Sequence, residues 1–202
     1  MRAEIEADSP FRVRFCLPPT VKMTQDEFFE LCQQNDGIWF ERTAEGDLIV
    51  SSPRGGLTGM QYVSVGAQLH EWAKRTASGM ALGSSTGFIL PNGANRTAAA
   101  SWISPKQLAT ITQEQKKKFV PICPCFIVEV LSPTDRFSLA QAKMDEYAAN
   151  GCKLGWLIDL DRTQVHVYRP GQPVQVLDNP QTLVGDPELP GFVLDLEPVW
   201  RP

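Results

Sequence analysis

One glutamate stands inside an otherwise apolar run and is the residue of this sequence best suited to do chemistry. Glu129 lies within "FIVEVL", where every other side chain is hydrophobic. A carboxylate is rarely buried unless it pairs with a cation or coordinates a metal ion. The run therefore predicts a functional carboxylate or, as the simpler alternative, a glutamate that lies on an edge strand or pairs with an arginine.

A lysine that follows fourteen residues later is the candidate partner of this carboxylate. The segment "SPTDR" turns the chain after the strand, and a helix predicted over 137–151 would return beside the strand's carboxyl end. From that helix, Lys143 would reach over Glu129. A lone helical lysine is more often exposed to solvent, so this pairing depends on how the helix packs.

Other catalytic arrangements find little support. The two histidines, His70 and His166, have no nucleophile in a recognisable turn, which disfavours serine or cysteine hydrolysis. The glycine-containing segments "SSPRGG" and "SSTG" match no nucleotide-binding fingerprint. Cys123 and Cys125 are the close pair among five cysteines, and no second pair has zinc-site spacing. We therefore expect reduced, structural thiols.

The bulk composition is that of a globular protein. Of 202 residues, 43% are hydrophobic and 21% are charged, and the net charge is −4. No apolar run has the length of a membrane span, and the first residues do not resemble a signal peptide, so we expect a cytoplasmic protein without membrane contact. The negative charge disfavours nucleic-acid binding by bulk attraction but allows local basic patches.

Helical and strand patterns interleave along the chain. Thr24 and Glu27 form a capping-box pattern that starts a first helix, and apolar spacing predicts further helices over 57–78 and 137–151. The alanines Ala98, Ala99 and Ala100 are placed in a short strand that continues to Ser104, although alanine is a poor strand former. Other strands are predicted within 37–52, 80–90, 125–132 and 153–177, and a final extended segment within 189–200.

This alternation predicts an α/β (α+β) fold, with a mixed central β-sheet flanked by helices and with N-terminal and C-terminal hairpins. The strand around Glu129 is expected to be buried on both faces because it is almost wholly apolar. We expect a single domain over residues 23–202, preceded by an N-terminal extension over residues 1–22.

The order of several segments resembles the Uma2 family, also called DUF820, over about residues 23–200. The segments are "FERTAEGDLIVSSPRGG", "STGFILPNGANR", "ASWIS", "PICPCFIVEVLSPTDR", "KMDEYAANGCKLGWLIDL", "VHVYRPG" and "LPGFVLDL". The resemblance implies a restriction endonuclease-like core of the PD-(D/E)XK superfamily, in a family abundant in cyanobacteria. In such a core an Asp and a Glu from neighbouring strands bind Mg²⁺ (or Mn²⁺), and a Lys acts near the scissile phosphate.

The resemblance assigns roles to individual residues. Glu129 falls on the metal-binding strand glutamate, whereas Leu131 stands where the superfamily usually has its lysine. In Uma2-like sequences the lysine lies on the next helix, at Lys143. Glu41 matches an acidic position of the N-terminal hairpin, as a further metal ligand or a supporting carboxylate; the alternative is a surface glutamate beside the turn.

The alanine segment departs from the family at the metal-binding aspartate. Relatives read Arg-Ser-Pro-Asp-Ala-Ser-Trp where residues 96–102 read Arg-Thr-Ala-Ala-Ala-Ser-Trp. Ala98 takes the position of the Pro and Ala99 that of the Asp, which fits natural loss as well as deliberate replacement. Losing a carboxylate about 4 Å from a divalent ion is expected to cost several kcal/mol, or about 10²–10⁴ in metal affinity.

Two functions follow as hypotheses. The first is a Mg²⁺-dependent DNA endonuclease whose activity is weak or lost because of Ala99. The second is a catalytically inactive relative that binds DNA or a protein partner. Arg54 and Arg96 are candidate substrate-binding residues for phosphate, whereas the run Lys116-Lys117-Lys118 is better explained as a solvated face. A homodimer is expected by analogy with nucleases that cut both strands.

Overall fold

A computed structural model describes residues 2–5, 12–18, 20–35, 37–51, 53–131 and 135–202 of the chain. The predicted strand positions 52 and 132, and residues 132–134 of the predicted loop, lie outside these described residues. In the part of the chain that the structure describes, no helix is long and apolar enough to span a membrane.

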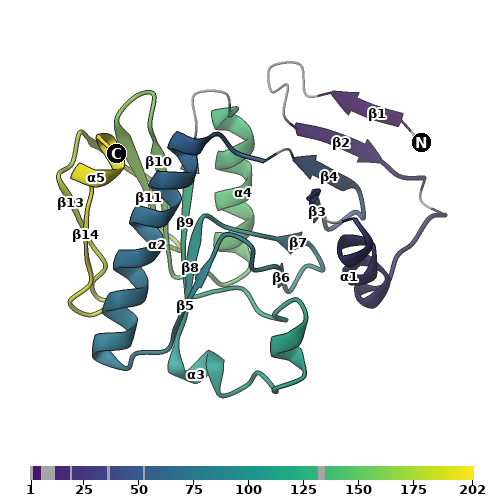
Figure 1. Cartoon of the computed structure of the whole chain (residues 1–202), viewed down its shortest axis with the longest axis horizontal. Helices are drawn as coiled ribbons and strands as arrows, with labels where there is room; N and C mark the ends of the chain where they lie inside the picture. The colour runs from purple at the N-terminus through teal and green to yellow at the C-terminus, as the bar shows by residue number, and fades with distance from the viewer. Residues whose placement is uncertain (1, 6–11, 19, 36, 52, 132–134) are drawn as a thin grey trace.

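The centre of the molecule is a mixed six-stranded sheet, as the sequence predicts (Figure 1). Strands β9 and β10 run parallel and are joined by helix α4, because a parallel pair needs a long crossover. The remaining neighbours are antiparallel. In sheet order the strands are β12 (Gln175–Asp178), β11 (Gln164–Tyr168), β10 (Leu154–Asp159), β9 (Phe126–Leu131), β8 (Ala100–Ile103) and β5 (Met80–Gly83).

A helix covers each face of this sheet (Figure 1). Helix α2 (Gly56–Thr76) packs Val65, Leu69 and Trp72 on one face, in a cluster that includes Phe126, Val128 and Val130 of β9. Helix α4 (Phe137–Ala149) packs Met144 and Tyr147 on the other, in a cluster with Ile127 and Leu131. Because strand side chains alternate between faces, Glu129 lies on the α4 side.

A second sheet adjoins the first and contains the predicted N-terminal hairpin of β3 and β4. Helix α1 (Gln25–Gln34) precedes this hairpin and begins with the predicted capping box of Thr24 and Glu27. In sheet order the strands are β1 (Arg2–Ile5), β2 (Arg12–Cys16), β4 (Leu48–Ser51), β3 (Trp39–Arg42), β7 (Asn95–Arg96) and β6 (Phe88–Ile89). Since β2 pairs with β4, part of the predicted N-terminal extension belongs to this sheet, and the boundary at residue 22 stays a prediction.

The prediction of one strand through the three alanines is wrong. Strand β7 ends at Arg96 in the second sheet, and β8 begins at Ala100 in the central sheet. Thr97, Ala98 and Ala99 carry the chain from one sheet to the other. The poor strand propensity of alanine is therefore consistent with a segment that connects a strand of one sheet to a strand of the other.

The C-terminal part adds a small hairpin and a last helical turn. Strands β13 (Thr182–Val184) and β14 (Val193–Asp195) pair antiparallel and pack near α2. Within the predicted extended tail, only Val193–Asp195 is a strand, and Glu197–Trp200 forms helix α5, whose first turn contains Pro198. Between β8 and β9 lie the short helix α3 (Pro105–Leu108), capped by Ser104, and a 3₁₀ turn at Gln115–Lys117.

Candidate active site

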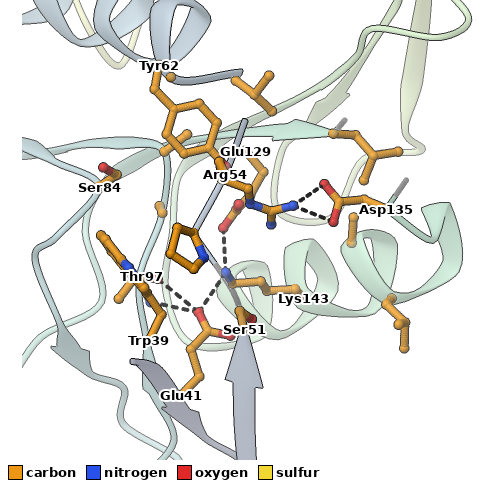
Figure 2. A pocket seen from close by; sticks show the side chains of 18 of the residues that line it. Trp39, Glu41, Ser51, Arg54, Tyr62, Ser84, Thr97, Glu129, Asp135 and Lys143 are labelled. Atoms are coloured by element: carbon orange, nitrogen blue, oxygen red, sulfur yellow. Dashed lines mark hydrogen bonds and ion pairs between the residues drawn. The ribbon is translucent and has the colours of Figure 1, made fainter. Parts of the chain in front are cut away.

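A cavity of about 310 Å³ opens where the two sheets meet, between the first turns of α2 and the middle of α4 (Figure 2). Glu129 and Lys143 line it, as does Glu41. The structure thus brings together three of the residues that the sequence singles out. Its wall also includes Ala98, Ala99 and Arg54.

Lys143 lies between two carboxylates (Figure 2). Its Nζ is 2.8 Å from Oε1 of Glu41 and 2.9 Å from Oε1 of Glu129. The three side chains are only 10–13% exposed. Helix α4 therefore places Lys143 beside Glu129, as the sequence predicts, and Lys143 is not the solvent-exposed lysine of the alternative.

Glu41 is the most heavily engaged of these carboxylates. Its Oε1 accepts hydrogen bonds from the backbone N–H of Thr97 at 3.0 Å and the Thr97 hydroxyl at 3.1 Å, in addition to the contact with Lys143. Its Oε2 lies 3.5 Å from Nη1 of Arg96. A buried carboxylate with four donors around it is not the surface glutamate that the sequence left as an alternative.

Arg96 is a buried arginine held between two acids. Its Nη1 faces Glu41, and its Nε donates to Oε2 of Glu146 at 2.5 Å. The side-chain amide of Asn92 donates to the other oxygen of Glu146 at 3.0 Å. Burial alone would lower the pKa of Arg96, but Glu41 and Glu146 raise it, so the guanidinium stays charged. Arg96 is not among the described residues that line the cavity. Phosphate binding by Arg96 stays a prediction that this placement does not favour.

Helix α4 contributes more than the lysine. Lys143, Glu146 and Tyr147 have i, i+3 and i+4 spacing and so share one helical face. The Tyr147 hydroxyl donates to the carbonyl oxygen of Thr97 at 2.7 Å. Sequence reasoning missed Glu146, Tyr147 and Thr97, although the helical spacing from Lys143 was a signal that would have found the first two.

The connection that contains the alanines forms one wall of the cavity. Strand β8 pairs Ala100 with Val128 of β9, so Ala99 and Glu129 are the next residues outward on these two segments. Both line the cavity, and Ala99 is 4% exposed. A carboxylate at position 99 would therefore share this cavity with Glu129.

An ion pair lies at another part of the same cavity (Figure 2). Nη1 of Arg54 is 2.6 and 2.7 Å from the two carboxylate oxygens of Asp135. Asp135, which precedes α4, thus also lines the cavity. Arg54 lines the cavity as expected for a phosphate ligand, but Asp135 neutralises it here.

The remaining sequence candidates lie elsewhere. Lys117 and Lys118 are exposed and pair with Glu114 and Asp26, in line with a solvated face. The five cysteines form no disulfide. Burial raises the pKa of Cys123 to about 12, so this thiol stays protonated, as expected for a structural residue. Trp102, Trp156 and Tyr168 are buried in the core.

The acidic side chains at the cavity offer the oxygen ligands that a hard cation binds, but they are few. Among the described residues, His, Cys, Asp and Glu nowhere gather in a group of three that could hold a metal ion. Mg²⁺ commonly takes one or two carboxylates together with water and substrate phosphate. Glu129 and Glu41 supply such oxygens at the cavity, so the donor chemistry of these residues fits Mg²⁺.

Strand β9 of the mixed sheet carries Glu129, and the helix that follows it, α4, places Lys143 beside this carboxylate. This arrangement is that of a restriction endonuclease-like α/β protein. The chain belongs to the Uma2 family, whose model, described as "Putative restriction endonuclease", matches residues 25–197. The resemblance inferred from the sequence is thereby confirmed.

A solved structure supports the fold. The crystal structure of "a putative nuclease belonging to DUF820" from Anabaena variabilis ATCC 29413 superposes with a TM-score of 0.70. The two chains are 21% identical, and the match covers 89% of this chain and 98% of that chain. No curated protein matches this chain. The likeness at this identity concerns the fold, and it agrees with the predicted fold class.

Proposed function

We propose that this protein is a Mg²⁺-dependent DNA endonuclease of the Uma2 type whose activity is strongly reduced because Ala99 stands at a metal-binding position. One observation carries the proposal. Glu129, Lys143 and Glu41 come from three separate elements and converge at one cavity, and Ala99 lies in the wall of that cavity.

The proposed metal ligand is Glu129, with the substrate phosphate and water completing the coordination. When bound, Mg²⁺ would neutralise phosphate charge and make a bound water a better nucleophile. Glu41 is a weaker candidate for direct coordination, because Thr97, Arg96 and Lys143 already surround both of its oxygens. We assign Glu41 to holding Lys143 in place.

Lys143 supplies positive charge at the reacting phosphate. Its ammonium group is fixed by two carboxylates in a mostly buried site, where charge interactions are stronger than in water. A prepositioned cation stabilises the negative charge that develops in phosphodiester hydrolysis. Arg54 would bind a neighbouring phosphate by exchanging its partner Asp135 for the substrate.

The test is cleavage of a supercoiled plasmid with Mg²⁺ or Mn²⁺ by the chain as it stands and by Ala99→Asp. We expect slow or undetectable cleavage by the first and metal-dependent cleavage by the second, at least about 100-fold faster. Adding Glu129→Gln to Ala99→Asp is expected to remove this activity. If folded Ala99→Asp does not cleave, the catalytic proposal is overturned in favour of a non-catalytic binding protein.

A further inference from the structure

The surface beside the catalytic cavity is aromatic and apolar. Trp39 and Tyr62 line the cavity, and Trp39 is 41% exposed. Trp39 precedes Glu41 by two residues on β3, so both side chains lie on the same face of the strand. The proposed chemistry uses neither aromatic ring.

Helix α2 continues this apolar surface outward. Val63 also lines the cavity and is 69% exposed, and Met60 and Leu57 precede it at intervals of three residues with exposures of 54% and 61%. These three side chains therefore form an outward stripe along the first turns of α2. Large apolar side chains that gather in this way on a surface indicate a binding region.

The charges that line the cavity balance. Among the described lining residues, Arg54, Arg136 and Lys143 are basic, and Glu41, Glu129 and Asp135 are acidic. The whole chain carries a net charge of −4. Binding of either duplex or single-stranded DNA by charge alone depends on an excess of Lys and Arg. The described lining residues do not carry such an excess, so stacking on aromatic side chains has to supply more of the affinity.

The size of the cavity points the same way. At about 310 Å³ it lies at the small end of sites that enclose a single small molecule, about 300–1,000 Å³. A duplex, whose major groove alone is about 12 Å wide, would have to stay outside. One nucleotide that has left its stack would enter, with its base against aromatic side chains.

We infer that this site takes unpaired nucleotides, so that single-stranded DNA is the preferred ligand over duplex DNA. The bases stack on Trp39 and Tyr62, and the phosphate faces Lys143 and Arg54. This inference rests on the proposed function, which supplies the nature of the ligand as DNA. Burial raises the pKa of Tyr62, so its ring stays a neutral phenol at physiological pH.

The test measures binding without chemistry. A fluorescently labelled 20-nucleotide single strand and the same sequence as a blunt duplex are titrated with the chain in EDTA, and anisotropy is recorded. We expect the single strand to bind at least about tenfold more tightly. Trp39→Ala is expected to weaken single-strand binding by about 5- to 150-fold, the usual loss for one stacked base, and to leave duplex binding unchanged. Trp39→Phe should retain most of the affinity.

Ile38→Ala is the matched control, because Ile38 is 45% exposed beside Trp39 but does not line the cavity. Equal or tighter binding of the duplex would overturn the inference. The inference would also be overturned if Trp39→Ala changed a dimer into a monomer but kept the affinity for single-stranded DNA. The apolar surface would then be a protein interface. If Ala99→Asp cuts duplex DNA as fast as single-stranded DNA, the preference for single strands is wrong, but the proposed endonuclease function stands. If Ala99→Asp neither binds nor cuts DNA, the proposed function is wrong as well.

Discussion

At the residue scale, ion pairs connect Glu146, Arg96, Glu41 and Lys143 in that order, and Glu41 joins the two cations. It contacts Lys143 on one side and Arg96 on the other, at 2.8 and 3.5 Å. A buried charge that loses its counter-charge is costly, because water cannot solvate it. Glu41 therefore couples the stability of the fold to the position of the lysine.

Replacing Glu41→Gln is expected to lower the free energy of unfolding by about 2–4 kcal/mol, because two buried cations lose a shared anion. Urea unfolding followed by circular dichroism measures the change. The matched control is Glu114→Gln, which removes an exposed partner of Lys117 and is expected to have no measurable effect. A stability of Glu41→Gln equal to that of this control would show that the ion pairs of Glu41 contribute nothing.

His166 predicts a pH dependence of stability. Its Nε2 is buried and finds no hydrogen-bond partner among the described residues, and its ring packs 4.7 Å from that of Phe137. Burial lowers its pKa from 6.5, Asp159 opposes this and Arg162 adds to it. In the folded state the imidazole therefore resists protonation below pH 6.5, while in the unfolded chain it accepts the proton.

The expected result is that the free energy of unfolding falls as pH decreases from about 6.5 toward the lowered pKa. His166→Gln is expected to flatten this part of the profile. Urea unfolding at several pH values measures the slope. A slope that survives in His166→Gln would assign the proton uptake to other groups.

At the scale of elements, α4 is the part that assembles the site. It delivers Lys143 to the cavity, Glu146 to Arg96 and Tyr147 to the carbonyl of Thr97. The last contact ties the helix to the connection between the two sheets. The position of the lysine thus depends on how α4 packs against that connection as well as on its own sequence.

Tyr147→Phe is expected to lower the free energy of unfolding by about 1–2 kcal/mol, because it leaves the Thr97 carbonyl without this buried donor. Tyr168→Phe is a closely matched control, since the buried Tyr168 hydroxyl has no hydrogen-bond partner in the described part of the chain. Thermal unfolding compares the two. Equal melting temperatures for both variants would contradict the role of Tyr147 in fixing α4.

Local patterns were enough to predict most elements. The capping box at Thr24, the apolar strand around Glu129 and the helix predicted over 137–151 depend on residues near one another in sequence. All three are observed, the helix as Phe137–Ala149. The strand assigned to Ala98 and Ala99 failed because their conformation is set by two sheets that the local sequence does not reveal. Likewise, Glu197–Trp200 forms a helical turn where an extended tail was predicted.

At the scale of the whole molecule, the site is an intersection of elements that are distant in sequence. Glu129 and Lys143 could be paired from the sequence because β9 and α4 are consecutive elements of the chain. The ion pairs of Asp135 with Arg54 and of Arg96 with Glu146 could not be predicted, because each joins residues that are far apart in sequence. The proposal that Ala99 stands at a metal-binding position came from the family resemblance, because no local pattern contains it.

The fold is expected to be stable without divalent metal. Two apolar clusters lie on opposite faces of the central sheet, and the carboxylates of the site have Lys143 and Arg96 as counter-charges. Adding EDTA should therefore change the melting temperature by less than about 2 °C, which corresponds to under about 1 kcal/mol for a chain of this size. Differential scanning calorimetry with and without EDTA measures this. A large decrease would indicate a structural metal.

The most direct measurement is a calorimetric titration of Mg²⁺ or Mn²⁺ into the chain and into Ala99→Asp, with Ala99→Asn as the uncharged control of similar size. Ala99→Asp is predicted to bind the ion about 10²–10⁴-fold more tightly than the other two, and to lose this gain when Glu129→Gln is added. Equal metal affinity for folded Ala99→Asp and Ala99→Asn would contradict the assignment of Ala99 and Glu129 to one incomplete metal site.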